Sequence, residues 1–297
     1  MKRFKNILIY LPAPGTSPEI FEWCRKITER SEPESVDVAH FLGEILPEYP
    51  GGTPADEAVS VEKELVEKIV EEQLPGVPTN VIVDSGEPLR GLLELLVKGS
   101  YDLVLVPVAD KQGRGFVERL VRKSPAGVLI VPAGCTPNLK RLRVAVDFSE
   151  LSPLAMKWAE AFASIGETTP ALEALHVMQM PAGSRATAAI EPGHLRAQIH
   201  QTSTEALKNF LEENAATPGS WKATVEEHGL SWMKILEEEE GENDLLVIGS
   251  HGRGAFSVAL LGSQSAEIIR EVQRPVLVVK QKNQTLGFLR QLVGLDP

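Results

Sequence analysis

The sequence has little cysteine and no long apolar run. Its two cysteines, Cys24 and Cys135, lie in different halves of the chain and predict neither a disulfide framework nor a metal cluster. No apolar stretch approaches the roughly 20 residues that a membrane-spanning helix needs. The basic N-terminus leads into a short apolar segment that breaks at Pro12, which is typical of a first strand and not of a signal peptide. We therefore expect a cytoplasmic protein that does not bind membranes.

Positive charge is also in short supply. The chain has 30 lysines and arginines against 41 aspartates and glutamates, which gives a formal net charge of −11. This balance argues against general binding to nucleic acids or to anionic membranes. It does not exclude one local anion site, because the amides at the start of a helix attract negative charge even in an acidic protein.

Several motifs of well-known enzyme classes are absent. There is no G-x-x-x-x-G-K-[S/T] segment, which excludes a P-loop NTPase. No G-x-G-x-x-G segment follows the first expected strand, so we do not expect a dinucleotide-dependent oxidoreductase. The chain also has no G-x-S-x-G elbow, no kinase catalytic loop and no cysteine–histidine spacing that suits structural zinc.

What the chain does have is an internal repeat. Its 297 residues, 43% of them hydrophobic, are enough for two domains. Apolar blocks recur in unchanged order, first 136 residues apart, then 142 and then 148, so the second half carries two insertions of six residues. This indicates duplication of one domain, with a boundary in the turn-rich segment 133–138. The matched blocks are 8–11 and 144–147, 38–41 and 174–177, 102–106 and 244–248, and 128–131 and 276–279.

Each half alternates short apolar runs with longer helical patterns. This alternation predicts a parallel sheet covered on both faces, so we expect two tandem doubly wound α/β domains of Rossmann-like type. Ligands of such sheets lie beyond the carboxyl ends of the strands. The expected strands are 6–11, 35–42, 79–84, 102–107, 128–132, 142–147, 171–178, 221–227, 244–249 and 275–280. The expected helices are 17–30, 57–73, 88–98, 114–123, 152–164, 194–214, 230–240 and 262–272.

One glycine motif follows an apolar run near the end of the second half. It reads Gly249-Ser250-His251-Gly252, then nine residues, then Gly262-Ser263 at the start of an expected helix. A strand, a glycine-punctuated loop and a helix can wrap backbone amides around phosphate. Glycine allows close approach of the chain and positive φ angles, and Ser263 adds a hydroxyl and an amide at the helix start. The alternative interpretation is a glycine-rich surface turn.

The spacing G-x-x-G-x9-G-[S/T] resembles the nucleotide-binding branch of the universal stress protein family. The resemblance covers about residues 4–280, is most specific in the second half, and implies a two-copy member of this family. It implies binding of ATP, or of AMP or ADP, together with Mg²⁺, and a role in stress adaptation. The last strands of the two halves would pair as an internal pseudo-dimer, and a further homodimer of chains is compatible with the resemblance.

The resemblance also implies a set of site residues. Asp147 would contact the ribose or help to hold Mg²⁺ through the nucleotide; alternatively, it caps the helix that starts near Ser152. The backbone of Val177 would contact the adenine edge. Gly262, Ser263 and Gln264 would present their amides to the phosphates. No catalytic residue is assigned. The implied ligand-binding residues are Ala145, Val146, Asp147, Val177, Ile248, Gly249, Gly252, Arg253, Gly262, Ser263 and Gln264.

Three of the residues near this motif have open interpretations. Arg253 either screens phosphate charge or points to water. Gln264 stands where the family usually has a small apolar residue, and either adds a polar contact or has no role. His176 matches His40 of the first half at the 136-residue offset, and a histidine that both copies share is interpreted as structural.

The first half lacks the features of the second-half site. Leu11 stands in the place of Asp147, and the segment 107–110 begins with a proline where the second half has its first glycine. The following loop is shorter by six residues. We therefore predict a degenerate copy over 1–136, a nucleotide-binding copy over 137–282, and one nucleotide per chain.

Two questions remain open at this level. The glycine loop has no nearby lysine or general base, which favours holding a nucleotide over cleaving it. The main hypothesis is an ATP-binding regulatory protein; the alternatives are a scaffold with a vestigial site and a weak ATPase. The tail 283–297 has apolar residues at helical spacing, and is either a helix that packs on its own domain or a docking segment.

Overall fold

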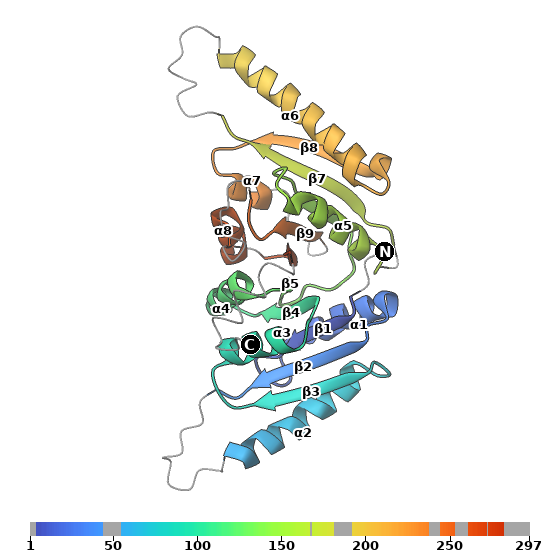
Figure 1. Ribbon diagram of the computed structural model, residues 1–297, viewed down its shortest axis with the longest axis vertical. Coiled ribbons are helices and arrows are strands. Elements are labelled where there is room, and N and C mark those ends of the chain that lie inside the picture. The colour runs from blue at the N-terminus through green and yellow to red at the C-terminus, as the bar shows by residue number, and fades with distance from the viewer. Residues whose placement is uncertain are drawn as a thin grey trace.

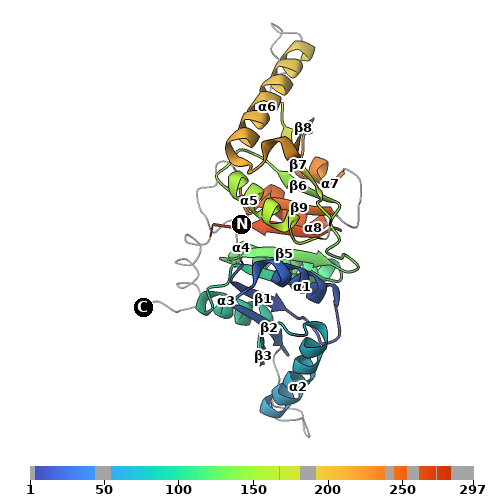
Figure 2. The same ribbon diagram turned by 90° about the vertical axis from the view of Figure 1, so that its right-hand side faces the viewer.

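The structure is a computed structural model. It describes residues 4–43, 55–166, 168–180, 192–237, 244–252, 261–271 and 273–281. These residues form one sheet of ten strands with helices on both faces, and the molecule is elongated, with α2 and α6 at its two ends (Figures 1 and 2). The predicted tail and Arg253 lie outside the described residues. None of the described helices combines the length and the apolar composition that crossing a membrane requires.

The bounds of the elements follow the predicted ranges closely. The first half contains β1 (Asn6–Tyr10), α1 (Glu19–Ser31), β2 (Ser35–Phe41), α2 (Ala55–Gln73), β3 (Thr79–Asp84), α3 (Pro88–Lys98), β4 (Leu103–Val108), α4 (Lys111–Lys123) and β5 (Gly127–Pro132). The second half contains β6 (Arg141–Ala145), α5 (Leu151–Ala163), β7 (Ala171–Met178), α6 (Pro192–Asn214), the short 3-10 helix η1 (Pro218–Ser220), β8 (Trp221–Glu227), α7 (Ser231–Glu237), β9 (Asp244–Gly249), α8 (Ser263–Glu271) and β10 (Val276–Val279).

Local chemistry explains where the elements begin and end. All six residues of β4 are buried, as expected of a central strand with helices on both sides. Helix α4 begins at Lys111, three residues before the predicted start, because the Asp110 carboxylate accepts a hydrogen bond from the Gly113 amide and caps the first turn. Strand β6 ends at Ala145, so Asp147 lies two residues beyond the strand and not within it.

The strand order is β3-β2-β1-β4-β5-β10-β9-β6-β7-β8, which confirms the expected doubly wound α/β class. All pairs are parallel except β5 with β10, which are antiparallel, with Leu129 opposite Leu277. The predicted pairing of the two last strands is thus confirmed. In each half the order of strands reverses once, between β1 and β4 and between β6 and β9. These are the two places where a doubly wound sheet opens a cleft.

Both hydrophobic cores continue across the join between the halves. One core lies on the face covered by α1, α2, α5 and α6, and the other on the face covered by α3, α4, α7 and α8. In the first core Phe4 contacts Trp158 of the second half edge to face, with ring centroids 5.0 Å apart. A Cβ atom on Gly127 would lie 2.4 Å from the Trp158 ring, so this glycine lets the indole lie against bare backbone.

The predicted boundary between the two copies, at residues 136/137, falls in the connection between β5 and β6 and stays a prediction.

A buried ion network crosses the strands of the second half. Glu173 on β7 and Arg143 on β6 are 2% and 1% exposed, and the Arg143 Nη2 atom lies 2.8 Å from Glu173 Oε2. The other carboxylate oxygen accepts hydrogen bonds from Thr224 Oγ1 at 2.7 Å and from Lys222 Nζ at 3.0 Å. Burial raises the pKa of Glu173, but these hydrogen bonds and the Arg143 charge outweigh it and hold the pKa at about 2.

Candidate functional site

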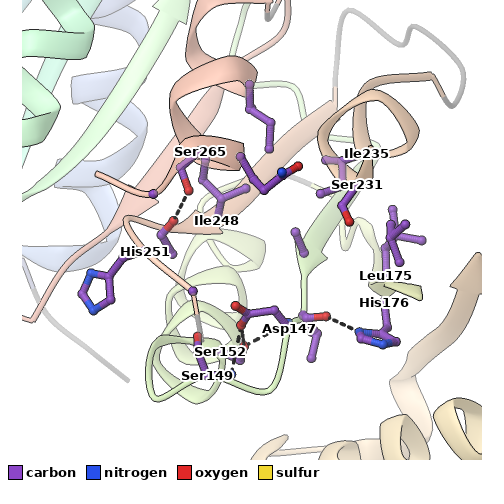
Figure 3. A pocket seen from close by; sticks show the side chains of 18 of the residues that line it. Asp147, Ser149, Ser152, Leu175, His176, Ser231, Ile235, Ile248, His251 and Ser265 are labelled. Atoms are coloured by element: carbon purple, nitrogen blue, oxygen red, sulfur yellow. Dashed lines mark hydrogen bonds between the residues drawn. The ribbon is translucent and has the colours of Figure 1, made fainter. Parts of the chain in front are cut away.

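A cavity of about 730 Å³ opens at the carboxyl ends of β6 and β9, where the strand order of the second half reverses (Figure 3). Its volume lies within the range of small-molecule sites, which is roughly 300–1,000 Å³. The walls come from the loop after β6, the end of β7, the segment after β9, the start of α8, and the facing sides of α6 and α7.

The structure brings most of the predicted site residues together around this cavity. Arg253 lies outside the described residues. Whether the others bind a ligand stays a prediction; what the structure gives is their common location. The predicted residues that line the cavity are Ala145, Val146, Asp147, Val177, Ile248, Gly249, Gly252, Gly262, Ser263 and Gln264.

The Asp147 carboxylate joins two loops of the site. Its Oδ1 atom accepts hydrogen bonds from the Ser149 amide and from the Ser152 hydroxyl, each at 2.9 Å (Figure 3). Its Oδ2 atom lies against Gly252, where a built Cβ atom would be only 2.4 Å away. The N-cap position of α5 is Glu150, which makes no side-chain cap bond, so Asp147 fixes the turn before the helix and is not its N-cap. One oxygen thus orders the loop while the other faces the segment after β9.

The glycines of the motif lie close to neighbouring parts of the chain. A Cβ atom on Gly249 would lie 3.0 Å from Leu151 Cβ, and one on Gly262 would lie 3.3 Å from His251 Cα. We expected positive φ angles as well, but none of Gly249, Gly252 and Gly262 has one. That expectation was wrong for these three positions, because the chain here packs against α5 and against itself in an ordinary conformation.

The two ends of the glycine loop are tied together. The Gly262 amide donates to the Ser250 carbonyl at 2.8 Å, and the Ser265 hydroxyl donates to the Gly249 carbonyl at 2.9 Å. The expectation that Gly262 offers its amide to a ligand is therefore wrong in this structure, since that amide closes the base of the loop. In the part of the chain that the structure describes, nothing accepts from the backbone amides of Ser263, Gln264 and Ser265. These three donors form the open N-terminus of α8, an arrangement that favours anions.

The histidines near the site have different roles. His176 Nδ1 lies 2.7 Å from the Val146 carbonyl, and His40 Nδ1 lies 2.8 Å from the Leu11 carbonyl. A carbonyl only accepts, so each Nδ1 carries the proton, and each ring ties a strand end to its neighbour. This repeated contact agrees with a structural role. The Leu11 amide bonds to Ala39 as the Val146 amide bonds to Leu175, so the structure matches Leu11 with Val146. The predicted match of Leu11 with Asp147 is therefore wrong by one residue. Burial and the charge of Lys280 lower the pKa of His251.

Part of the cavity wall carried no signal in the sequence. Ile199 and Ser203 come from α6, and Ser231 and Ile235 come from α7. These helices reach the site only through tertiary packing, and neither follows a motif. One contact between α7 and α8 is a hydrogen bond of 2.9 Å from the Trp232 amide to the Gln264 side chain.

Comparison with known proteins gives a consistent set of similarities. Residues 138–280 match the model described as the universal stress protein family. A universal stress protein of Methanocaldococcus jannaschii is 28% identical over 158 residues, which cover 48% of this chain and 96% of that protein. The match thus spans nearly all of that protein and about half of this chain.

Two solved structures are similar over nearly the whole chain. A functionally unknown protein of Pseudomonas aeruginosa PAO1 is 15% identical, with a TM-score of 0.70 and coverage of 99% of this chain and 98% of that one. A universal stress protein of Archaeoglobus fulgidus is 18% identical, with a TM-score of 0.59 and coverage of 95% and 98%. At these identities the likeness shows the fold alone, and it extends through both halves.

Proposed function

The chain belongs to the universal stress protein family through residues 138–280, and from this premise we propose that its second half binds one adenine nucleotide as a regulatory ligand. The observation that carries the proposal is the cavity between β6 and β9. Its lining includes the start of α8, whose first amides have no acceptor among the described residues, and the Asp147 carboxylate. An anionic group of the ligand would be complementary to the α8 amides. A hydroxyl group or a bound metal ion would be complementary to the Asp147 carboxylate.

These walls suggest how a nucleotide would lie. The phosphates would meet the amides of Ser263, Gln264 and Ser265, where the helix dipole also favours negative charge. The base would lie against Val177 and Ile235, on the apolar side of the cavity. Oδ2 of Asp147, the only carboxylate among the described lining residues, would face the ribose or the metal.

Magnesium fits this donor set. Mg²⁺ in nucleotide sites is usually held by one or two carboxylates, with phosphate oxygens and water completing its shell. Asp147 supplies one carboxylate whose Oδ1 is already oriented by Ser149 and Ser152. When bound, the ion would neutralise phosphate charge; this chain's contribution is to hold the carboxylate in place.

The site favours retention of the nucleotide over its cleavage. No lysine or arginine is present among the lining residues that the structure describes, and the pKa of His251 is lowered by burial. Rapid phosphoryl transfer needs several positioned charges and a group that orients the nucleophile. We therefore propose a sensor that changes with nucleotide occupancy, and not an efficient ATPase.

The first half supports a single site per chain. Tyr10 and Phe116 stack there, with ring centroids 5.0 Å apart. Tyr10 lies opposite Ala39 on β2 as Ala145 lies opposite Leu175 on β7, so the strand registers match Tyr10 with Ala145. The repeat offset of 148 residues matches Phe116 with Gln264, and both Ala145 and Gln264 line the second-half cavity. We infer that these two stacked rings fill the first-half counterpart of the cavity.

We expect calorimetric titration with ATP and Mg²⁺ to give one site per chain. The same ligand should raise the melting temperature, because it binds only the folded chain. Two equivalent sites would contradict the assignment to one half. No heat and no thermal shift would favour the scaffold with a vestigial site, and phosphate release well above that of a Gly262→Val variant would favour the weak ATPase.

A further inference from the structure

The side-chain amide of Gln264 is oriented by its contact with α7. The Trp232 backbone N–H donates to Gln264 Oε1 at 2.9 Å. An N–H can pair only with the oxygen of an amide group, so this contact fixes which way the amide is turned. The NH₂ group is thereby placed on the opposite side, and it has no acceptor among the residues that the structure describes.

Gln264 belongs to the same turn of α8 as the free backbone donors. Gln264 is the second residue of the helix and lines the cavity together with Ser263 and Ser265. Those neighbours present backbone amides, which are donors and carry no formal charge. A fourth neutral donor at the same place extends an anion-binding array in a cavity where no described lining residue is a lysine or an arginine.

We infer that Gln264 is a ligand-positioning residue whose side-chain NH₂ donates to the phosphate of the bound nucleotide while its carbonyl oxygen holds the N-terminus of α7. The inference rests on the proposed function and concerns the anionic end of the same site. It assigns a specific role to a side chain that replaces a small apolar residue in the resembling family. Phosphate, Gln264 and the Trp232 amide then form one hydrogen-bonded chain.

Two variants separate the two halves of the Gln264 amide. Gln264→Glu keeps an oxygen for the Trp232 amide but replaces the donor with a negative charge. Gln264→Ala removes both groups. Gln201→Glu, on the exposed side of α6, makes the same charge change away from the cavity and serves as the control.

The measurement is calorimetric titration of each variant with ATP and Mg²⁺ and, separately, with adenosine, which has no phosphate. A hydrogen bond to a charged group is worth about 1.5–3 kcal/mol, so Gln264→Glu should bind ATP at least ~10-fold more weakly. Its affinity for adenosine and both affinities of the control should stay within about twofold of wild type. Gln264→Ala should weaken ATP binding and also expose the Trp232 amide to hydrogen exchange, whereas Gln264→Glu should keep that amide protected.

The outcomes distinguish the inference from the proposed function. If the wild type binds ATP and Gln264→Glu binds it equally well, Gln264 acts only through α7 and the inference is overturned alone. Equal weakening of ATP and adenosine by Gln264→Glu also overturns it. If the wild type binds neither ligand, the proposed function fails and the inference fails with it. An unprotected Trp232 amide in the wild type would remove the orientation argument itself.

Discussion

The Gly252→Ala variant is expected to bind ATP about 100-fold more weakly than the wild type, a loss of about 2.7 kcal/mol. The new Cβ atom would lie 2.4 Å from Asp147 Oδ2, well inside contact distance. The carboxylate is held on its other side by the Ser149 amide and the Ser152 hydroxyl, so it cannot move aside without losing those bonds. Either the loop after β6 or the segment after β9 must shift, and both form the cavity wall.

A matched substitution controls for the intrinsic effect of adding a methyl group. Gly219 lies in η1, has no positive φ angle, and a Cβ atom there meets nothing within 4 Å. Gly219→Ala should therefore bind ATP like the wild type. Both variants should melt within a few degrees of the wild type, because Gly252 lies at the surface end of the sheet and not in its core. Wild-type affinity in Gly252→Ala would show that the nucleotide does not use this wall.

Replacement of Glu173 by alanine is expected to destabilise the fold by about 3–5 kcal/mol. The substitution leaves the guanidinium of Arg143, 1% exposed, without the carboxylate that lies 2.8 Å from it. Thr224 and Lys222 lose their acceptor as well. Chemical denaturation at pH 7 measures the effect, and Glu212→Ala on the exposed side of α6 is the control. A loss below about 1 kcal/mol would show that water or a rearranged partner compensates for the charge.

The same residue should make stability fall in acid. The pKa of Glu173 is about 2 in the folded chain, against an ordinary value of 4.5, so its contribution is fully present above pH 4.5. It is lost as the pH falls from 4.5 through 2, and the difference of 2.5 pKa units corresponds to about 3 kcal/mol. Glu173→Gln should flatten the pH dependence of unfolding in this window. An unchanged slope would show that Glu173 is not the titrating group.

The sequence predicts the ends of strands better than the contents of the cavity. Continuous apolar runs such as β4 and β9 identify buried strands, and Asp147 and Gly249 then fall at one edge because parallel strands share their direction. The fate of the Gly262 amide could not be predicted, because its partner is a carbonyl twelve residues away whose position depends on the whole loop.

The sequence pattern could not predict which helix residues contact the cavity. Nothing in the spacing of α6 or α7 indicates that Ser203 or Ser231 faces the site. The orientation of Gln264 depends on the Trp232 amide, 32 residues earlier in the chain. Sequence reasoning identified Gln264 as an unusual residue, but its hydrogen-bond partner is set by how α7 packs on α8.

The antiparallel contact between β5 and β10 has a consequence for how the protein responds to dilution. Two separate subunits joined along such an edge would come apart as their concentration falls. Here a single chain carries both edges, so the local concentration of each for the other is set by the connection between β5 and β6 and does not depend on how much protein the cell makes. Pairing of the two edges is thus an intramolecular event.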